Sequence, residues 1–433
     1  MKDLQTLGRS ATCMACALLT FAPVASKGGQ ENPSPNNHTT SYTIHDLGVI
    51  GGAPAQPYGM SDNRLIAGGV LTDSGAAHAV VWRNGNPKDI GAPGFGGINS
   101  LATGVNDFGF VVGAAQTQDF SGEDFCGFNA FGLAESNTTC LPFVWNHRTM
   151  LPLPTLGGAN GYANMINGQG EAVGYAETTE HETGCGVNRF LPVRWREGHA
   201  HPLPLINGDS DGVAAWINDK GQVVGATGTC GAFNVNSQLY LVEEHAVMWE
   251  NGRVIDLGNL GGDGAGAGNH ACSLNNRGQV VGHSNLRNDV TFHAFLWTKE
   301  KRMQDLGTLD TDPASLGLGI NDAGLVVGAS LDPEFIPRAF VWKDGLMTDL
   351  NTLKDGDPGL DLLMAYDVNE RGEIDGLAVS RDGQLHGFVA IPSHARIASA
   401  AETGPMARPK LTDEARRLMK QELAHRHHVG GWQ

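Results

Sequence analysis

The acidic residues that could bind a ligand stand in short Asp- and Gly-rich segments that recur along the chain. The segment NGDSDG, residues 207–212, places oxygen-bearing side chains at alternate positions ahead of a glycine, as the start of a calcium-binding loop does. It lacks the later acidic ligand of such a loop, and turn formation by Asp, Asn and Gly is the alternative interpretation. Calcium is the one cofactor that the sequence suggests. The candidate calcium ligands are Asn207, Asp209 and Asp211, and the wider set of candidate binding residues is Asp209, Asp211, Asp263, Asp310, Asp312, Asp355 and Asp357.

Five cysteines follow the first 26 residues, and four of them lie in long segments between apolar runs. In an exported protein such cysteines pair, so we expect Cys126 to bond Cys140 and Cys185 to bond Cys230. The first pair would close one loop, and the second would link two neighbouring repeats. Cys272 is left as a buried thiol. Zinc binding is the alternative, although these five cysteines form no C-x-x-C pair.

A histidine stands before several apolar runs and could act as a general base. The four positions are His78, His245, His293 and His386, and the corresponding residues of other runs are Leu141, Leu191 and Arg338. A position that exchanges with leucine favours packing over catalysis. The sequence also contains no nucleophile elbow, P-loop or H-E-x-x-H motif. We therefore predict no catalytic residue.

The candidate aspartates, cysteines and histidines lie between copies of a phrase of the form I-N-D-x-G-x-V-V-G, which recurs seven times. Its copies stand at 105–113, 166–174, 217–225, 274–282, 320–328 and 368–376, with a degenerate copy at 60–68. An apolar run follows each copy, and six of the seven runs end in Trp82, Trp145, Trp195, Trp249, Trp297 and Trp342. A phrase resembling D-L-G follows each tryptophan. Self-similarity of this kind indicates tandem supersecondary units.

Each unit supplies four short strands, which we letter a to d. Strand a precedes the Asn, the N-D-x-G step is a tight turn, V-V-G is strand b, the run ending in Trp is strand c, and D-L-G ends strand d. Four-stranded units in tandem predict a β-propeller, and a solenoid is the alternative. The folded region opens with a lone strand d, 42–48, and ends with strands a to c, 364–391. Joining them completes a seventh blade and removes exposed edges. We predict an all-β, seven-bladed propeller over 42–392 with strand a innermost.

The connections give the two ends of the blades different characters. The a–b and c–d turns are short and share one face, which we call the turn face. The b–c and d–a connections share the other, which we call the loop face. The longest connections are the b–c loops 114–140, 175–189 and 226–244. Because variable loops on a rigid scaffold carry binding residues, we predict that the loop face is functional.

The repeated phrases resemble those of the bacterial extracellular HAF-repeat proteins. The likeness rests on His293-Ala294-Phe295, on D-L-G-x-L-G-G at 256–262 and on the I-N-D-x-G-x-V-V-G copies, and it covers about residues 42–391. The missing last tryptophan, the degenerate first phrase and the cysteine-bearing insertions depart from the pattern. The resemblance implies export and tandem repeats, and it implies no catalytic residue.

The two ends of the chain lie outside the predicted propeller. Residues 1–26 have a basic start, an apolar stretch and a small-residue end, which predicts a signal peptide and places the protein in the periplasm or outside the cell. Residues 27–41 predict a polar linker. Residues 393–433 predict a linker and a short basic helix over 411–428, capped by Thr412, in a solvated and frayed tail. No segment is apolar and long enough to predict a membrane span.

Composition narrows the function further. Glycine contributes 60 of 433 residues, which is typical of a protein rich in turns, and the net charge of −17 disfavours nucleic acid and anionic membranes as partners. We expect a monomeric, non-enzymatic binding module whose loop face engages a protein, glycan or small ligand. A secreted lyase or hydrolase with an axial pocket on the same face is the first alternative. A structural surface protein that associates through the tail 411–428 is the second.

Overall fold

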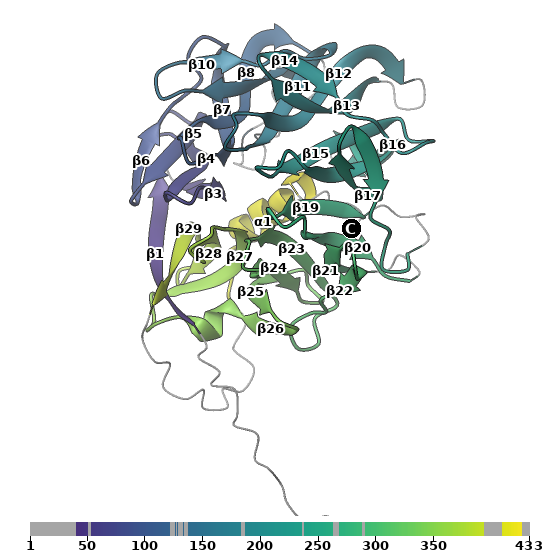
Figure 1. The fold of residues 1–433 in the computed structure, drawn as a ribbon. Helices are drawn as coiled ribbons and strands as arrows, with labels where there is room; N and C mark the ends of the chain where they lie inside the picture. Colours follow the sequence, from purple (N-terminus) through teal and green to yellow (C-terminus); the bar gives the residue numbers. More distant parts are fainter. Residues whose placement is uncertain are drawn as a thin grey trace, which may run out of the picture. The chain divides into compact units, whose positions relative to one another are not determined.

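The repeated units fold as seven antiparallel blades arranged in a ring (Figure 1), which confirms the predicted seven-bladed β-propeller. The computed structural model describes residues 40–50, 53–121, 126, 128, 133, 137–182, 187–235, 238–262, 268–287, 291–393 and 409–426. The predicted signal peptide and most of the predicted linker, 27–41, lie outside these residues. No helix in the described part of the chain is long and apolar enough to cross a membrane.

Six blades are built from consecutive strands. Blade 1 contains β3 (Gln56–Met60), β4 (Leu65–Leu71), β5 (Ala77–Arg83) and β6 (Asn86–Asp89). Blade 2 contains β7 (Gly96–Val105), β8 (Val111–Phe120), β9 (Thr138–Trp145) and β10 (Met150–Pro152), and blade 3 contains β11 (Gly157–Ile166), β12 (Ala172–Glu182), β13 (Val187–Arg196) and β14 (His199–Pro202). Blade 4 contains β15 (Asp211–Ile217), β16 (Val223–Val235), β17 (Gln238–Glu250) and β18 (Arg253–Asp256). Blade 5 contains β19 (His270–Leu274), β20 (Val280–Asn285), β21 (Phe292–Thr298) and β22 (Arg302–Asp305), and blade 6 contains β23 (Ala314–Ile320), β24 (Val326–Leu331), β25 (Pro337–Lys343) and β26 (Leu346–Asp349).

Blade 7 joins the two ends of the propeller. Its strands are β27 (Leu360–Val368), β28 (Ile374–Ser380) and β29 (Leu385–Ser393), followed in space by β1 (Ser41–Ile50) and by the short β2 (Ala53–Pro54). The helical turn η2 (Leu350–Leu353) leads into this blade. Strands β1 and β29 pair from Ser41 opposite Ser393 to Gly48 opposite Gly387. The N-terminal strand therefore closes the ring, as predicted, and pairs the edge that β29 would otherwise expose.

The first strand of each blade packs against the first strand of the next all the way round, so strand a is innermost. The V-V-G glycines let these strands come close to strand b. A Cβ atom on Gly225 would overlap the carbonyl oxygen of Val213 in the neighbouring strand a, and one on Gly328 would overlap that of Leu316. Five of the six tryptophans that end strand c are buried, for example Trp82 and Trp297 at 0 and 1% exposure, whereas Trp342 is half-buried.

The predicted C-terminal helix is present as α1 (Asp413–Arg426), but it is not the solvated tail that we expected. Thr412 caps it by accepting a hydrogen bond from the Ala415 N–H at 3.1 Å, as predicted. Figure 1 shows α1, in yellow, lying across the middle of the ring. Leu418 and Met419 are buried against the inner strands β23 and β27. The apolar face of the helix, which is visible in the sequence, thus packs against the propeller.

Candidate functional site

On the turn face, the asparagine of each repeated phrase links its blade to the next one. Its side-chain oxygen accepts backbone N–H groups of its own turn; in Asn275 these come from Arg277 and Gln279, both at 3.0 Å. Its side-chain amide donates to the carbonyl of the corresponding residue in the following blade, over 2.9–3.4 Å. The six asparagines that form these links are Asn106, Asn167, Asn218, Asn275, Asn321 and Asn369. The repeated phrase that identifies each blade therefore also supplies a hydrogen bond that connects it to the next blade.

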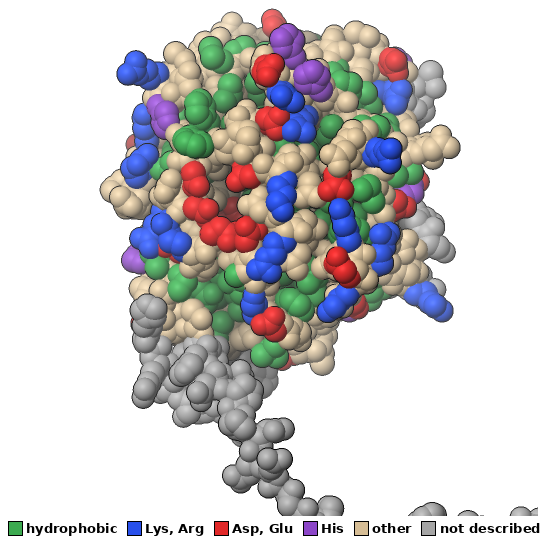
Figure 2. Space-filling view, in the orientation of Figure 1, with side chains coloured by type: hydrophobic (Ala, Val, Ile, Leu, Met, Phe, Trp, Pro, Cys, Tyr) green, Lys and Arg blue, Asp and Glu red, His purple; other side chains and the backbone are tan. Residues whose placement is uncertain are grey.

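The next position of the phrase brings carboxylates together on the same face, a feature that we did not predict. Figure 2 shows acidic side chains gathered round a hollow on the face that it draws. The five carboxylates at this position each accept a backbone N–H from a neighbouring blade, and we call them the carboxylate ring. Its members are Asp62, Asp107, Asp219, Asp322 and Glu370. Acidic residues at the third position of five copies of the phrase were the available signal.

Burial and crowding disturb the ionisation of this ring. Burial raises the pKa of Asp62, and the charges of Asp107 and Asp219 raise it further, against a backbone hydrogen bond to Glu370 that lowers it. Burial likewise raises the pKa of Glu370, with the charge of Asp322 adding to the effect. Like charges close together disfavour ionisation. The ring is held in place by backbone N–H groups, which gives it a structural role between the blades.

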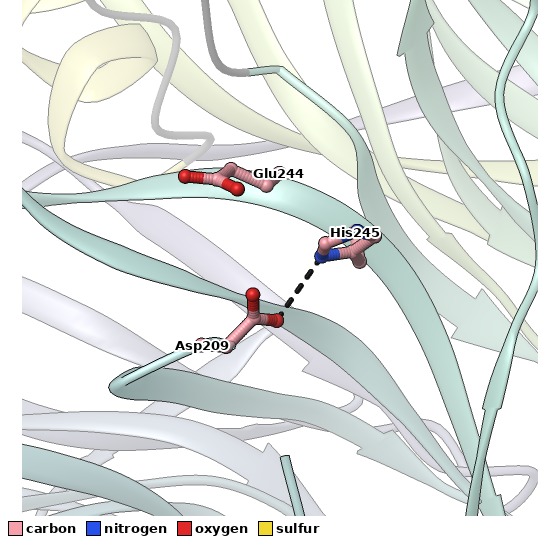
Figure 3. Close-up of side chains that lie close together, drawn as sticks. All are labelled: Asp209, Glu244 and His245. Carbon is pink, nitrogen blue, oxygen red and sulfur yellow. Dashed lines mark hydrogen bonds and ion pairs between the residues drawn. The ribbon is translucent and has the colours of Figure 1, made fainter. Parts of the chain in front are cut away.

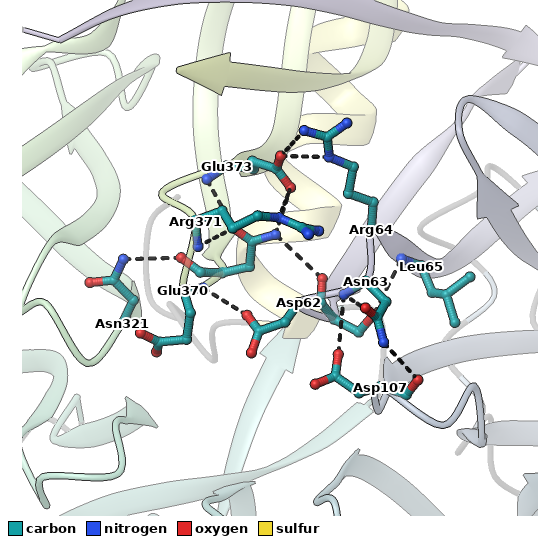
Figure 4. A network of polar contacts seen from close by, with 11 residues as sticks. Asp62, Asn63, Arg64, Leu65, Asp107, Asn321, Glu370, Arg371 and Glu373 are labelled. Atoms are coloured by element: carbon teal, nitrogen blue, oxygen red, sulfur yellow. Dashed lines mark hydrogen bonds and ion pairs between the residues drawn. The ribbon is translucent and has the colours of Figure 1, made fainter. Parts of the chain in front are cut away.

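The seam between blades 7 and 1 carries an ion pair beside this ring. Arg64 donates from Nε to Glu373 Oε1 at 2.5 Å, and Asn369 donates to Glu373 Oε2 at 2.8 Å (Figure 4). Burial raises the pKa of Glu373, but the hydrogen bonds from Arg64 and Asn369 outweigh it, and the pKa is lowered overall. Arg64 comes from the degenerate first phrase and has a φ of 59°, where other copies place glycine. Blade 1 thus has an arginine in place of the turn glycine, and this arginine forms an ion pair with Glu373 of blade 7.

On the loop face, apolar groups cover the inner strands. The α1 residues Ala415, Leu418, Met419 and Leu423 form one cluster with side chains of blades 6 and 7. Thr412 donates from Oγ1 to the carbonyl of Gly383 in the b–c loop of blade 7, which places the start of α1 on this face. Helix α1 therefore lies over the middle of the ring (Figure 1), where a lyase or hydrolase would need a polar pocket.

The b–c connection of blade 2 packs against inner strands from another side. Phe128 is buried at 2% exposure and belongs to one apolar cluster with Leu101 of β7 and Tyr162 of β11. Within the same cluster, Cys126 and Cys140 form a disulfide with Cα atoms 5.3 Å apart, as predicted. Cys185 and the side chain of Cys230 lie outside the described residues, so their pairing stays a prediction.

Cys272 keeps its thiol, but it is only half-buried. Its sulfur lies 3.8 Å from Nδ1 of His283, and it packs against the cluster that α1 helps to build. The ring of His283 stacks on that of His270, whose Nδ1 lies 2.6 Å from the buried Glu243. A histidine and glutamate partnership next to Cys272 was not predicted.

The predicted binding residues lie in different blades. Asp310 and Asp312 both bind the guanidinium of Arg338 in blade 6, at 3.0 and 2.9 Å. Asp357 pairs with Arg381 on the surface of blade 7, and the nearby Asp355 is also exposed. Asp263 lies outside the described residues.

The loop that resembles a calcium site is divided by the fold. Asp211 is buried at 1% exposure and begins β15, where it accepts hydrogen bonds from the Phe190 N–H at 2.9 Å and the Ser210 hydroxyl at 2.5 Å. Asn207 is exposed. Asp209 instead turns toward β16 and β17. The three residues therefore do not converge as ligands of one ion.

Asp209 meets Glu244 and His245, and we call these three residues the blade-4 cluster (Figure 3). Its ligand atoms all lie within 4.8 Å of one another, and Nδ1 of His245 is 3.1 Å from Oδ2 of Asp209. Thr227 donates to the same oxygen of Asp209, and Thr229 donates to Oε1 of Glu244 at 2.7 Å. One imidazole and two carboxylates are a metal-binding donor set. Asp209 was predicted as a metal ligand, whereas Glu244 and His245 were not.

The other histidines that begin strand c behave differently from His245. Nδ1 of His78, His293 and His386 lies 2.7–3.0 Å from the aspartate of the D-L-G phrase in the same blade. Those partners are Asp89, Asp305 and Asp46. The position is thus a hydrogen-bonding site at the edge of the blade, where we had expected packing.

Comparison with known proteins gives no family. No family model and no curated protein matches the chain. Among solved structures, the β-propeller domain of the Trilobed protease from Pyrococcus furiosus is 11% identical, with 84% of this chain and 99% of that chain covered and a TM-score of 0.47. A gluconolactonase from Xanthomonas campestris is 10% identical, with 81 and 90% covered and a TM-score of 0.34. An ulvan lyase is 10% identical, with 78 and 92% covered and a TM-score of 0.37. No activity is transferred from likenesses of this size.

Proposed function

We propose that the chain is an exported, non-enzymatic binding protein that contacts its ligand through the long hairpins of blades 3 and 4 on the loop face. Export to the periplasm or the outside is part of this proposal, as is kinship with the extracellular HAF-repeat proteins. The ligand is a protein, a glycan or a small molecule. The net charge of −17 disfavours polyanions among these classes.

The length of the b–c hairpin in blade 4 carries the proposal. Strands β16 and β17 have 13 residues each, whereas the corresponding β24 and β25 of blade 6 have 6 and 7. Blade 3 shows the same extension, with 11 residues in β12 and 10 in β13. The shorter hairpins suffice to build a blade, so the additional length is available for contacts beyond the scaffold.

A lyase or hydrolase with an axial pocket is the second candidate. The packing of α1 and Phe128 against inner strands supports binding over catalysis, because these groups fill space on the face where such a pocket would open. A surface protein that associates through its tail is the third candidate. The burial of Leu418 and Met419 within this chain leaves less of α1 for a partner.

To test this proposal, the long hairpin of blade 4 is exchanged for a short one, and both the retention and the cleavage of candidate ligands are measured. Residues 230–242 are replaced by the blade 6 connection, 332–336, and both chains are probed on an array of neutral and amine-bearing glycans and peptides. We expect retention of one or more probes by the full chain, recovery of those probes intact by mass spectrometry, and loss of retention in the exchanged chain. Equal retention by the two chains would contradict the proposed surface. Cleaved probes would favour the enzyme.

A further inference from the structure

The blade-4 cluster has a counterpart in blade 6 that shows what occupies such a place. The Asp209 N–H donates to the Ile206 carbonyl at 3.1 Å, and the Asp312 N–H donates to the Leu309 carbonyl at 3.0 Å. Each aspartate also accepts a hydroxyl from the same position of strand b, Thr227 in blade 4 and Ser330 in blade 6. Asp209 and Asp312 are therefore equivalent in backbone turn and in side-chain support.

The two blades differ in the residue that faces this aspartate. Blade 6 places Arg338 there, four residues before its tryptophan, and the guanidinium lies 2.9 Å from Asp312 and 3.0 Å from Asp310. Blade 4 places His245 at the same position and adds Glu244 beside it. A permanent cation thus neutralises the carboxylates of blade 6. In blade 4 the equivalent carboxylate meets an imidazole and a second carboxylate.

His245 also departs from the other histidines of the repeat. His78, His293 and His386 bind the aspartate that ends strand d, and the residue at that position in blade 4 is Asp256. The ring of His245 is instead directed at Asp209, whose side chain is 3% exposed (Figure 3). The imidazole therefore faces the buried carboxylate, where its nitrogen can share an ion with it.

We propose that Asp209, Glu244 and His245 bind one divalent transition-metal ion, zinc above all, at the base of the β16–β17 hairpin. Metal–ligand bonds of about 2.0–2.2 Å place ligand atoms roughly 3–3.5 Å apart, so Asp209 and His245 are already at that spacing. Glu244 completes the set by a side-chain rotation within the 4.8 Å that now contains all three ligand atoms.

The donor set selects the class of metal. Calcium takes six to eight oxygen ligands, whereas zinc combines imidazole nitrogen with carboxylate oxygen in sites of three protein ligands and one open position. Thr227 and Thr229 orient the two carboxylates, as outer-shell groups do in such sites. The ion would join the d–a loop of blade 4 to its long hairpin. This inference stands on the cluster itself and does not require the proposed binding function.

The test titrates zinc into the metal-stripped full chain, in which His427 and His428, two histidines near the end of the sequence that would compete for zinc, are replaced by alanine. We expect one equivalent to bind, a cobalt-substituted form with the visible absorption of a four-coordinate site, and a higher thermal midpoint with zinc. His245→Ala should raise the Kd at least about tenfold. The matched control, His293→Ala, removes the histidine from the same position in blade 5 and should leave the Kd unchanged.

His245→Arg tests the proposed zinc site even if His245→Ala does not fold. His245→Arg copies the arrangement of blade 6, so it should fold, lose zinc binding and lose the zinc-dependent rise in thermal midpoint. Zinc binding by His245→Arg that equals the binding by the parent chain would overturn the proposal. The absence of a bound equivalent in the parent chain would overturn it as well.

Discussion

At the scale of the residue, the asparagine of the repeated phrase does more than form a turn. Asn275 accepts two backbone N–H groups of its own turn and donates across the blade boundary to the Asn321 carbonyl at 2.9 Å. Blade 1 has Ser61 at this position, which caps its turn but has no amide to donate. Asn63 replaces the missing link by donating to the Asp107 carbonyl at 3.1 Å. The degenerate phrase thus keeps the contact between blades by another route.

Asn275→Ala should lower the free energy of unfolding by about 2–4 kcal/mol, because buried backbone groups on two blades lose their partner. Chemical denaturation followed by tryptophan fluorescence measures the change. Asn86 is exposed and makes only a weak local bond, so Asn86→Ala is the control and should stay within about 0.5 kcal/mol. Equal effects of the two substitutions would refute the role assigned to the phrase.

The ion pair at the seam predicts a dependence of stability on pH. Because the pKa of Glu373 is lowered on folding, its contribution is complete above the ordinary carboxyl pKa of about 4.3 and is lost as the pH falls through the folded value. Glu373→Gln should cost about 1–2 kcal/mol at pH 7, at the lower end because the Arg64 side chain is 42% exposed.

Denaturation curves at several pH values test this. The gap between the parent chain and Glu373→Gln should narrow below about pH 4.3. Glu414→Gln removes a carboxylate from an exposed helical pair with Arg417 and should have little effect at any pH. A gap that stays constant with pH would contradict the assignment.

At the scale of the element, α1 shows what a pattern in the sequence can and cannot predict. Its cap and its apolar face were visible in the sequence, because Thr412, Ala415, Leu418 and Leu423 stand at helical spacing. Its docking site was not visible, since the surface that receives it combines side chains of blades 6 and 7 and exists only when these blades are folded. Helical periodicity marks which face is buried and says nothing of the partner.

Met419→Asp should release α1 from the ring, because Met419 is fully buried and a carboxylate there has no paired cation. We expect faster cleavage within 409–426 by a protease and a lower thermal midpoint. The neighbouring Lys420 is exposed, so Lys420→Asp introduces the same carboxylate outside the contact and should leave both readings unchanged. Equal cleavage of the two variants would argue against docking.

The blade-4 cluster marks the limit of prediction at a site. The repeated phrases place His245 at the start of a strand, and the acidic loop nominates Asp209 as a ligand. The choice of His245 between Asp209 and Asp256 depends on side-chain orientation, which repeat alignment does not encode. Glu244 is likewise found only when the d–a loop and the long hairpin lie side by side.

At the scale of the whole molecule, the ring and its closure can be predicted from the repeat. The parts of the loop face that are open to a ligand cannot. The number of blades, the innermost strand and the β1–β29 closure were all predicted from the phrases and the two ends of the folded region. The loop face was predicted to be functional, and an axial pocket on that face belonged to the enzyme alternative. The structure places α1 across that axis, so we propose that binding occurs farther out, at the hairpins of blades 3 and 4.

Closure of the axis by α1 is tested most directly by the rate at which the thiol of Cys272 reacts with iodoacetamide, measured at that residue by peptide mass spectrometry. Cys272 packs against the cluster that α1 completes, so removal of 394–433 should expose it. We expect slow labelling in the full chain and an increase of at least about tenfold in the shortened chain, because access to the thiol controls its reactivity. Equal rates in two folded chains would mean that α1 does not close the axis.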